Sequence, residues 1–452
     1  MGMSRTVTGH AGVAVRRWIA ATARRTLGIT LFAMALGGCR QSAKEPVTLT
    51  FLNPEWSQPD EVPSAEYAAQ QFTRETGIRL RHPPVPETSL SQLELSRELL
   101  QKRGPAPDVL GMDVIWPGIL EEYLIDLRPY FATEISSLDP DLVDSYTVNG
   151  KVVAVPYHAQ VGALAYRTDL LREYGYNHPP RTWDELENMA ARIQAGERAK
   201  GRKEFWGYIW QGAAGEGLTC NALEWQFAEG GGRIIENDRT ISVKNPAAIR
   251  AWLRARHWIG WISPPSVVAY SELDTLNVWE SGGAAFRRTW QWHYRLTHQQ
   301  ESAMSDRTGY ASMPGGPGGR VGTLGGTGLA VSRQSAHPQE AVELIRFLIR
   351  RELQPEEKGA GAQPSSQPEM YELPSVLGSY GHSDVPNDPK SGVVSRPSNV
   401  AGHEYEEVTR AYIAAVHAVL TRQKGAQEAG AELEEQLIKI TGFRAGPPKR
   451  AD

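Results

Sequence analysis

Tryptophans and polar side chains recur where the sequence predicts that strands end and loops begin. An indole face is broad, apolar and electron-rich, so it suits the C–H face of a sugar ring, whose hydroxyls then bond to carboxylates, amides and arginines. The same indoles would serve equally well in an apolar core. The aromatic residues at these positions are Trp56, Trp116, Tyr157, Trp206, Trp210, Trp290 and Trp292. Trp290 fits a binding role best, because a predicted buried strand delivers it to a loop.

Signatures of the common enzyme classes are absent from the sequence, which has no G-x-x-x-x-G-K-[ST], H-E-x-x-H or G-x-S-x-G motif. His293 and His298 are five residues apart, the wrong spacing for metal ligands on one helical face. The glycines at 315–319 and 325–326 lack the strand-to-helix context of a dinucleotide loop and are expected to form turns. We therefore expect no catalytic residue, metal or cofactor. A glycoside-hydrolysing carboxylate pair stays open, since any two acidic residues can meet in space.

The length and composition are those of a soluble globular protein with more than one lobe. The chain has 452 residues, of which 40% are hydrophobic and 22% are charged, whereas a single domain usually has about 100–200 residues. The formal net charge of −4 argues against a nucleic-acid partner. Two cysteines cannot form a disulfide scaffold, and Cys220 is expected to be a small buried side chain in a helix.

The N-terminus has the layout of a bacterial export signal. Five arginines and no acidic residue precede or flank a short apolar stretch at residues 26–38, which is too short to span a membrane as a helix. Small residues lead directly to Cys39, as in a lipobox, so we expect a signal peptide at 1–38, lipidation of Cys39 and a tether at 39–45. An uncleaved buried helix is the alternative. The arginine pair at 24–25 leaves open whether export uses the Sec or the twin-arginine route.

Strand and helix patterns alternate at the start of the exported chain. The sequence predicts strands at 47–52, 78–81 and 108–114, with helices at 64–76 and 90–102 between them. This alternation is typical of a parallel α/β sheet, in which ligands bind beyond the carboxyl ends of the strands. Further strands are expected at 151–156, 162–166, 308–313 and 329–332. Further helices are expected at 183–195, 218–228, 246–259, 272–281, 338–351, 403–420 and 427–441.

Several segments together resemble the extracellular sugar-binding proteins of ABC importers. The stretch Phe-Trp-Gly-Tyr-Ile-Trp-Gln-Gly at 205–212 is similar to the trehalose/maltose-binding branch, and the resemblance extends over roughly residues 46–445. The other segments that carry it are 107–116, 166–171, 174–186, 216–220 and 325–332. The resemblance implies an α/β fold of two lobes, the periplasmic-binding-protein fold, with a ligand cleft between them. It assigns 46–156 and 314–350 to lobe one, and 157–313 and 351–452 to lobe two.

The resemblance also implies which residues contact the ligand. Glu61, Asp113, Trp290, Gly325 and Arg396 match sugar-contact positions of the family, and other candidates near the cleft are Trp116, His158, Gln160, Glu216 and Trp292. His158 and Gln160 stand where the trehalose/maltose relatives have an aromatic residue and an aspartate, and Ser91 or Gln92 replaces an expected arginine. The missing aspartate and arginine would remove charge-assisted hydrogen bonds. These departures put trehalose and maltose themselves in doubt, while a carbohydrate is still expected.

Three of these assignments have structural alternatives. Asp113 could cap a following helix, Arg396 could be a surface residue, and Gln160 could satisfy backbone groups of the hinge. If these residues contact a ligand, the chain is expected to be a monomeric, lipid-anchored receptor of the cell envelope. It would bind a neutral di- or oligosaccharide, deliver it to the transmembrane permease of an ABC importer, and carry out no chemical step. An envelope glycoside hydrolase is the alternative.

The lipid anchor makes a direct prediction. Cys39→Ser removes the thiol that would accept the lipid, so the variant should appear as an unprocessed precursor or in the soluble fraction. Fractionation of the expressing bacteria and immunoblotting measure this, with Cys220→Ser as the control that keeps the anchor. A processed Cys39→Ser protein that still sediments with membranes would show that the anchor assignment is wrong.

Overall fold

The computed structural model describes residues 46–54, 62–86, 89–102, 106–136, 138, 140–290, 304–352 and 391–449. The expected signal peptide, Cys39, Glu61 and Trp292 lie outside these residues. Within them, no helix is both long and apolar enough to cross a membrane.

The first part of the chain forms the predicted parallel α/β sheet. Strand β1 (Thr48–Leu52) pairs in parallel with β2 (Arg79–Arg81) and β3 (Val109–Asp113). Helices α2 (Val62–Thr76) and α3 (Ser89–Gln101) connect them. The carboxyl ends of β1 and β3 therefore lie at one edge of the sheet, and Asp113 is the last residue of β3.

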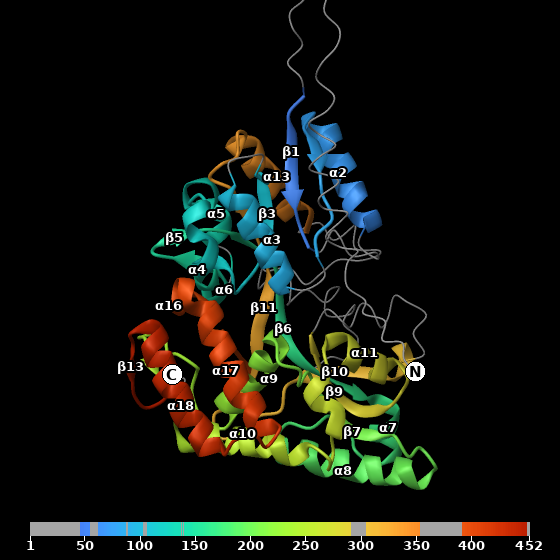
Figure 1. Cartoon of the computed structure of the whole chain (residues 1–452). Helices are drawn as coiled ribbons and strands as arrows, with labels where there is room; N and C mark the ends of the chain where they lie inside the picture. The colour runs from blue at the N-terminus through green and yellow to red at the C-terminus, as the bar shows by residue number, and fades with distance from the viewer. Residues whose placement is uncertain are drawn as a thin grey trace, which may run out of the picture. The chain divides into compact units, whose positions relative to one another are not determined.

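Two long antiparallel strands connect this sheet to the rest of the protein. These are β6 (Val155–Arg167) and β11 (Arg320–Val331), which lie side by side in Figure 1. In the part of the chain that the structure describes, the sheet has nine strands, with β2-β1-β3-β11-β6-β9-β7 as its main order. At one end β11 pairs with β3, and at the other β6 pairs with β9 (Ala284–Trp290) and β10 (Thr308–Ser312).

The continuity of β6 and β11 corrects two expectations. The sequence predicts a loop at 157–160 and a turn at 325–326, but these residues face each other in one ladder, Gln160 opposite Gly325 and His158 opposite Thr327. Gly326 has a φ of 135°, and the register shifts between Thr327 and Gly328. Local glycine content favours a turn, whereas the distant partner strand supplies the hydrogen bonds that keep this segment extended.

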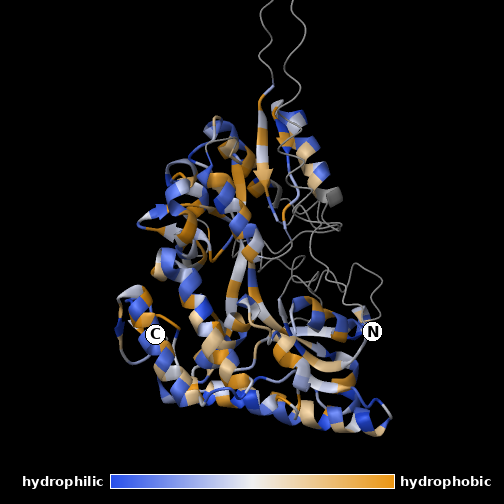
Figure 2. Cartoon of the chain, in the orientation of Figure 1, coloured by the Kyte–Doolittle hydropathy of each residue, from blue (hydrophilic) through white to orange (hydrophobic). Residues whose placement is uncertain are grey.

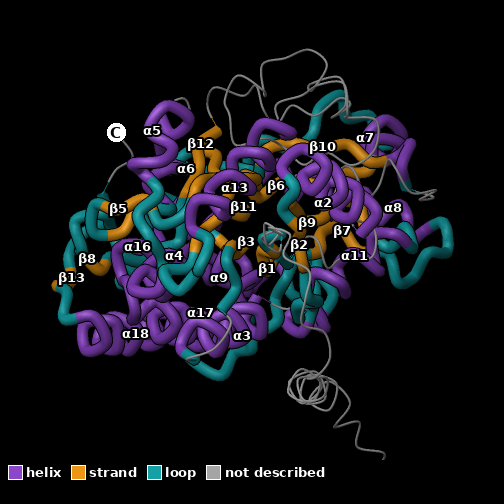
Figure 3. The backbone as a smooth tube through the Cα atoms, turned by 90° about the horizontal axis from the view of Figure 1, so that it is seen from above, coloured by secondary structure: helices purple, strands orange, loops and turns teal. Residues whose placement is uncertain are grey.

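The second body of the fold is built around β9. Strand β7 (Trp206–Ile209) pairs with it in parallel, so β7 runs in the direction of the carboxyl end of β9, where Trp290 lies. The helices here are α8 (Trp183–Ala199), α9 (Glu216–Ala228), α10 (Pro246–Trp258) and α11 (Glu272–Glu280). Figure 3 shows helices on both sides of the central strands, and α8 and α17 show both hydropathy colours along their length in Figure 2, as amphipathic helices do.

The C-terminal segment contacts both ends of the central strands. Strand β12 (Ser391–Val394) pairs in parallel with β11 opposite Arg320–Thr323. Four residues later α16 (Ser398–Ala401) packs against α4 (Pro117–Leu120), where the Ser398 hydroxyl donates to the Val114 carbonyl at 3.2 Å. The segment therefore crosses beside β6 and β11. It continues into α17 (Tyr405–Leu420) and α18 (Ala426–Thr441), while α13 (Pro338–Glu352) follows β11.

The remaining elements are short. They are η2 (Glu121–Tyr123), α5 (Arg128–Ser136), α6 (Pro140–Ser145), β4 (Thr147–Val148), β5 (Lys151–Val152), α7 (Thr168–Glu173), β8 (Thr240–Ile241), η3 (Pro265–Ala269), η4 (Ser305–Arg307), η6 (Gly402–Glu404) and β13 (Arg444–Ala445).

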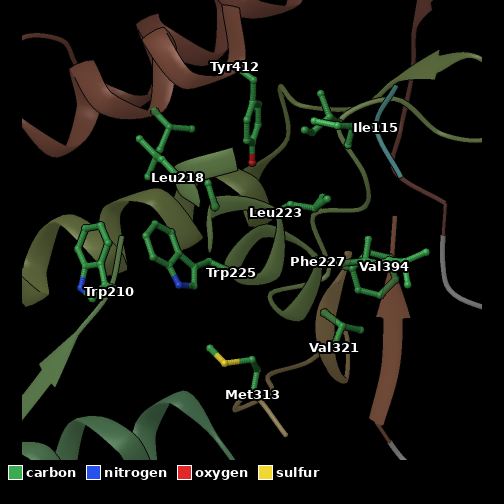
Figure 4. Close-up of a cluster of buried hydrophobic side chains, with 14 of the residues drawn as sticks. Ile115, Trp210, Leu218, Leu223, Trp225, Phe227, Met313, Val321, Val394 and Tyr412 are labelled. Carbon is green, nitrogen blue, oxygen red and sulfur yellow. The ribbon is translucent and has the colours of Figure 1, made fainter. Parts of the chain in front are cut away.

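Most of the tryptophans belong to the core. Trp210 and Trp225 are nearly inaccessible, and their ring centroids are 4.9 Å apart in an edge-to-face arrangement. Figure 4 shows the two indoles in a cluster with Leu218 and Leu223. Trp116 is only 1% exposed and packs in the same apolar cluster. The interpretation of Trp210 as a loop-end binding residue is therefore wrong, and Trp116 lies among core side chains. Edge-to-face packing of this kind stabilises the core beyond the contribution of burying the rings.

A buried ion pair lies where β6, β9, β11 and α9 meet. Arg288 of β9 donates to Glu224 of α9 at 2.7 Å, and both side chains are inaccessible to solvent. Glu224 also accepts the Thr323 backbone N–H of β11 at 2.9 Å. A Cβ at Gly162 of β6 would overlap the bonded ends of both side chains, so glycine there makes room for the pair.

Gly162→Ala should destabilise the protein by about 3 kcal/mol, in the lower part of the range for breaking a buried pair. The added methyl group must displace Glu224 or Arg288 from its partners. Chemical denaturation followed by tryptophan fluorescence measures the change. Gly215→Ala is the matched control, because nothing lies within 4 Å of a Cβ at that position. Equal stability of the two variants would contradict this account of Gly162.

Candidate functional site

Six of the predicted site residues gather around the middle of β6 and β11. We call them the β6–β11 site, and they are Asp113, Gln160, Glu216, Trp290, Gly325 and Arg396. Gln160 and Gly325 lie on the two long strands, Asp113, Glu216 and Trp290 lie at the ends of elements, and Arg396 follows β12 in the connection to α16. The paired strands bring together positions that are up to 283 residues apart in the chain.

Asp113 places a carboxylate at the carboxyl end of β3. It accepts the Ser89 hydroxyl at 3.1 Å and the Ile115 backbone N–H at 3.3 Å, and its side chain is 28% exposed. Burial raises the pKa of the Asp113 carboxyl, and the positive charge of Arg396 opposes this. The N-cap residue of α4 is Trp116, and no side chain caps the helix, so the helix-cap alternative for Asp113 is wrong. The carboxylate keeps an exposed side that can accept hydroxyl groups.

Arg396 joins Asp113 to the start of α9. Its guanidinium donates to Glu216 Oε2 at 3.0 Å and to the Leu324 carbonyl at 3.4 Å, and lies 3.6 Å from Asp113 Oδ1. Only 6% of Arg396 is exposed, so the surface-arginine alternative is wrong. A buried guanidinium needs such carboxylate partners, because moving an unpaired charge out of water is unfavourable. Removing one partner from a buried ion pair typically destabilises a protein by about 3–5 kcal/mol.

Glu216 is fully engaged by protein groups. Besides Arg396 it accepts the Tyr405 hydroxyl at 3.1 Å and the Thr409 hydroxyl at 2.6 Å. It is the first residue of α9, where the helix dipole also favours a negative charge. Its side chain is 27% exposed. The bonds indicate that Glu216 holds Arg396 and α17 in place beside the site.

Trp290 ends β9 and lies against Gly325. A Cβ at Gly325 would come within 2.9 Å of the indole Cζ3, so the strand approaches the ring closely only because this residue is glycine. The indole Nε1 donates to Glu272 at 2.8 Å, and the Arg288 guanidinium lies 4.1 Å from the ring centroid. The ring is half-buried. Its position is therefore defined on several sides while part of it stays accessible.

His158 and Gln160 occupy β6 beside these groups. Gln160 is half-buried and opposite Gly325, two residues before the Gly162–Trp290 pair of the ladder. His158 is 5% exposed, and its ring centroid lies 3.8 Å from that of Tyr157. The structure thus brings Gln160 into the row of Gly325 and Trp290, whereas the imidazole of His158 is enclosed by protein.

Three charged residues near the site were missed by the sequence analysis. They are Glu224, Glu272 and Arg288, which lie behind or beside Trp290. The sequence held one indication of them: two consecutive arginines in a predicted buried strand need carboxylate partners, because buried charges are normally paired. Which carboxylates would serve could not be found from local sequence, since Glu224 lies 64 residues away.

Two hollows border the described part of the chain near these elements. One of about 250 Å³ is lined by Arg396, Leu324 and Ile115 together with residues of α6 and of the loop at 233–237. The other, about 760 Å³, is bounded by Trp206 and Tyr270. Trp206 begins β7, whereas the site lies toward the end of the parallel strand β9, so the larger hollow is separate from the β6–β11 site.

The described residues offer little for metal or thiol chemistry. Among them, no group of three or more His, Cys, Asp or Glu side chains is arranged to hold a metal ion. Burial raises the pKa of the Cys220 thiol to about 12, so it stays protonated and unreactive at neutral pH.

Comparisons with known proteins agree with the resemblance. Residues 56–355 match the family described as bacterial extracellular solute-binding protein. A Deinococcus radiodurans protein named "Probable ABC transporter-binding protein" is 38% identical over 422 residues, which cover 92% of this chain and 98% of that protein.

Solved structures of sugar-binding proteins are also similar. Maltose-bound MalE3 of T. maritima superposes with a TM-score of 0.75 at 30% identity, covering 87% of this chain and 100% of MalE3. The GacH receptor of Streptomyces glaucescens, solved unliganded and with acarbose, has a TM-score of 0.70 at 20% identity over 88% and 99% of the two chains, and shows the fold alone. The predicted two-lobe α/β fold is thereby confirmed.

Proposed function

Since the chain belongs to the family of bacterial extracellular solute-binding proteins and is a receptor of an ABC transporter, we propose that its ligand is a neutral di- or oligosaccharide. The observation that carries this proposal is the half-buried indole of Trp290, held beside Gly325 of β11, while the Asp113 carboxylate ends the strand that pairs with β11 at Thr327. An indole face packs on a sugar ring, and a carboxylate accepts its hydroxyls. Maltose-bound MalE3, at 30% identity, supports a disaccharide of this kind.

The two lobes would close over the sugar. We assign lobe one to 46–156 and 314–350 and lobe two to 157–313 and 351–452, with β6, β11 and the segment around Arg396 joining them. Asp113 then belongs to lobe one, and Glu216 and Trp290 to lobe two. A ligand that contacts both lobes binds the closed arrangement more tightly than the open one, so its binding favours closure. The movement would be a hinge closure of the two lobes around the ligand. The closed receptor presents both lobes to the permease.

The receptor is located outside the cytoplasm, because it belongs to a family of extracellular proteins. We propose that a lipid on Cys39 tethers it to the membrane through residues 39–45 and that it acts as a monomer. Glu61, Gln160 and Trp292 complete the proposed ligand contacts, and Trp116 and His158 line the site from behind. Trp116 and His158 are buried in the structure, so they would act through the shape of the site wall.

A thermal-shift screen over neutral mono-, di- and oligosaccharides tests the proposal. At least one di- or oligosaccharide should raise the melting temperature, because a ligand that binds only the folded state stabilises it. The bound sugar is then recovered and analysed by mass spectrometry. Intact sugar is the expected result, cleaved sugar would identify a glycoside hydrolase, and the absence of any stabilising sugar would contradict the proposed ligand class.

Trp290→Ala should weaken binding of the sugar found in that screen by about 2 kcal/mol, roughly 30-fold in the dissociation constant. The variant loses the stacking surface of the site, and calorimetric titration measures the effect. Trp261→Ala is the matched control, because that indole is 37% exposed and lies in the loop after α10. Similar dissociation constants for the two variants would remove Trp290 from the binding surface.

A further inference from the structure

Four charged residues that the proposed function does not use lie around Trp290. Arg287 and Arg288 are consecutive residues of β9 and are at most 1% exposed, while Glu224 comes from α9 and Glu272 from α11. Consecutive residues of a strand point to opposite faces of the sheet. Glu272 nevertheless lies 3.8 Å from Arg288 Nη1 and 3.9 Å from Arg287 Nη2. Glu272 therefore lies where both guanidinium groups can reach it.

Glu272 is also the hydrogen-bond acceptor of the Trp290 indole. Its Oε1 receives the Nε1–H at 2.8 Å, and its Oε2 receives the Gln211 amide at 2.9 Å. The ring itself lies over the Arg288 guanidinium at 4.1 Å. One carboxylate thus binds the edge of the indole and balances the cation beneath the ring's face.

The position of Glu272 is itself fixed by the local fold. It is the first residue of α11, whose N-cap Ser271 forms a capping box with Asp274. The Ser271 hydroxyl accepts the Asp274 N–H at 3.2 Å, and Asp274 accepts the Ser271 N–H at 2.8 Å. A capping box fixes the start of the helix and so the backbone from which Glu272 projects.

The cation beneath the ring is anchored to the long strands. Arg288 is bound by Glu224, which also accepts the Thr323 N–H of β11, two residues before Gly325. The same strand therefore carries the glycine that meets the indole and the backbone group that holds the ion pair. The indole is positioned at its edge by Glu272, at one face by Arg288 and against the strand by Gly325.

We propose that Glu272 is a positioning residue of the sugar site, acting through Trp290. The proposal rests on the proposed function, in which the indole stacks on the sugar. Without the carboxylate the indole loses its only protein acceptor among the described contacts and can rotate away from the orientation that a sugar ring meets. Glu272 would contribute to affinity by orienting the ring before the ligand arrives, which lowers the ordering cost of binding.

A double-mutant cycle tests this, because coupled residues give non-additive effects. Glu272→Ala should weaken binding of the best sugar about tenfold in the wild-type background. It should change the dissociation constant less than twofold in the Trp290→Phe background, where no indole N–H remains. Glu272→Gln keeps an acceptor oxygen and should bind within about threefold of wild type. Leu273→Ala, its 64% exposed neighbour on α11, is the control.

A second measurement needs no ligand. In ¹⁵N-labelled protein, the Trp290 indole resonance is assigned by its disappearance in Trp290→Phe, and its hydrogen exchange is followed. Exchange should accelerate in Glu272→Ala and stay slow in Glu272→Gln and Leu273→Ala. Unchanged exchange in Glu272→Ala, or equal loss of sugar affinity in both backgrounds, overturns the proposal. If wild-type protein binds no sugar, the proposed function fails, while the exchange measurement still decides whether Glu272 positions Trp290.

Discussion

The structure depends on two arginines that are buried because carboxylates of α9 neutralise them. Arg288 of β9 binds Glu224, and Arg396 of the C-terminal segment binds Glu216. Removing a partner from such a pair leaves an unpaired charge in a medium that solvates it poorly. The helix between the two carboxylates is itself buried from Leu218 to Ala228. Strand β9 and the C-terminal segment are therefore held to a single helix, and β11 joins them through the Thr323 N–H.

The proposed ligand groups follow from these pairs. Arg396 reaches from Glu216 to Asp113 and so links the end of β3 to the start of α9. Arg288 lies under the indole of Trp290, and the ladder places Gly162 and Gly325 where the ion pair and the ring need room. Two glycines are thus required by large neighbours that come from other elements, and the indole of Trp290 meets the Glu272 carboxylate and the Arg288 guanidinium beside these strands.

Sequence patterns predicted the parallel sheet of β1, β2 and β3 and the positions of the later helices, because hydrophobic periodicity and caps are local signals. The resemblance predicted Trp290 and Gly325 as sugar-contact positions, and the structure places these two residues in contact with each other. Residues 157–160 and 325–326 were predicted as loop and turn, since strands rich in glycine and polar residues resemble turns until their distant partner is known. Glu272 was missed for the same reason, as its role depends on a strand that begins twelve residues later.

The most direct test of a sugar site beside the paired strands β6 and β11 is a crystal structure with the best sugar of the screen bound. We expect a sugar ring stacked on the accessible face of the Trp290 indole, with at least one hydroxyl bonded to Asp113, and an intact glycosidic bond. A sugar bound elsewhere, for example in the hollow beside Trp206 and Tyr270, with Trp290 and Asp113 making no contact to it, would contradict the account.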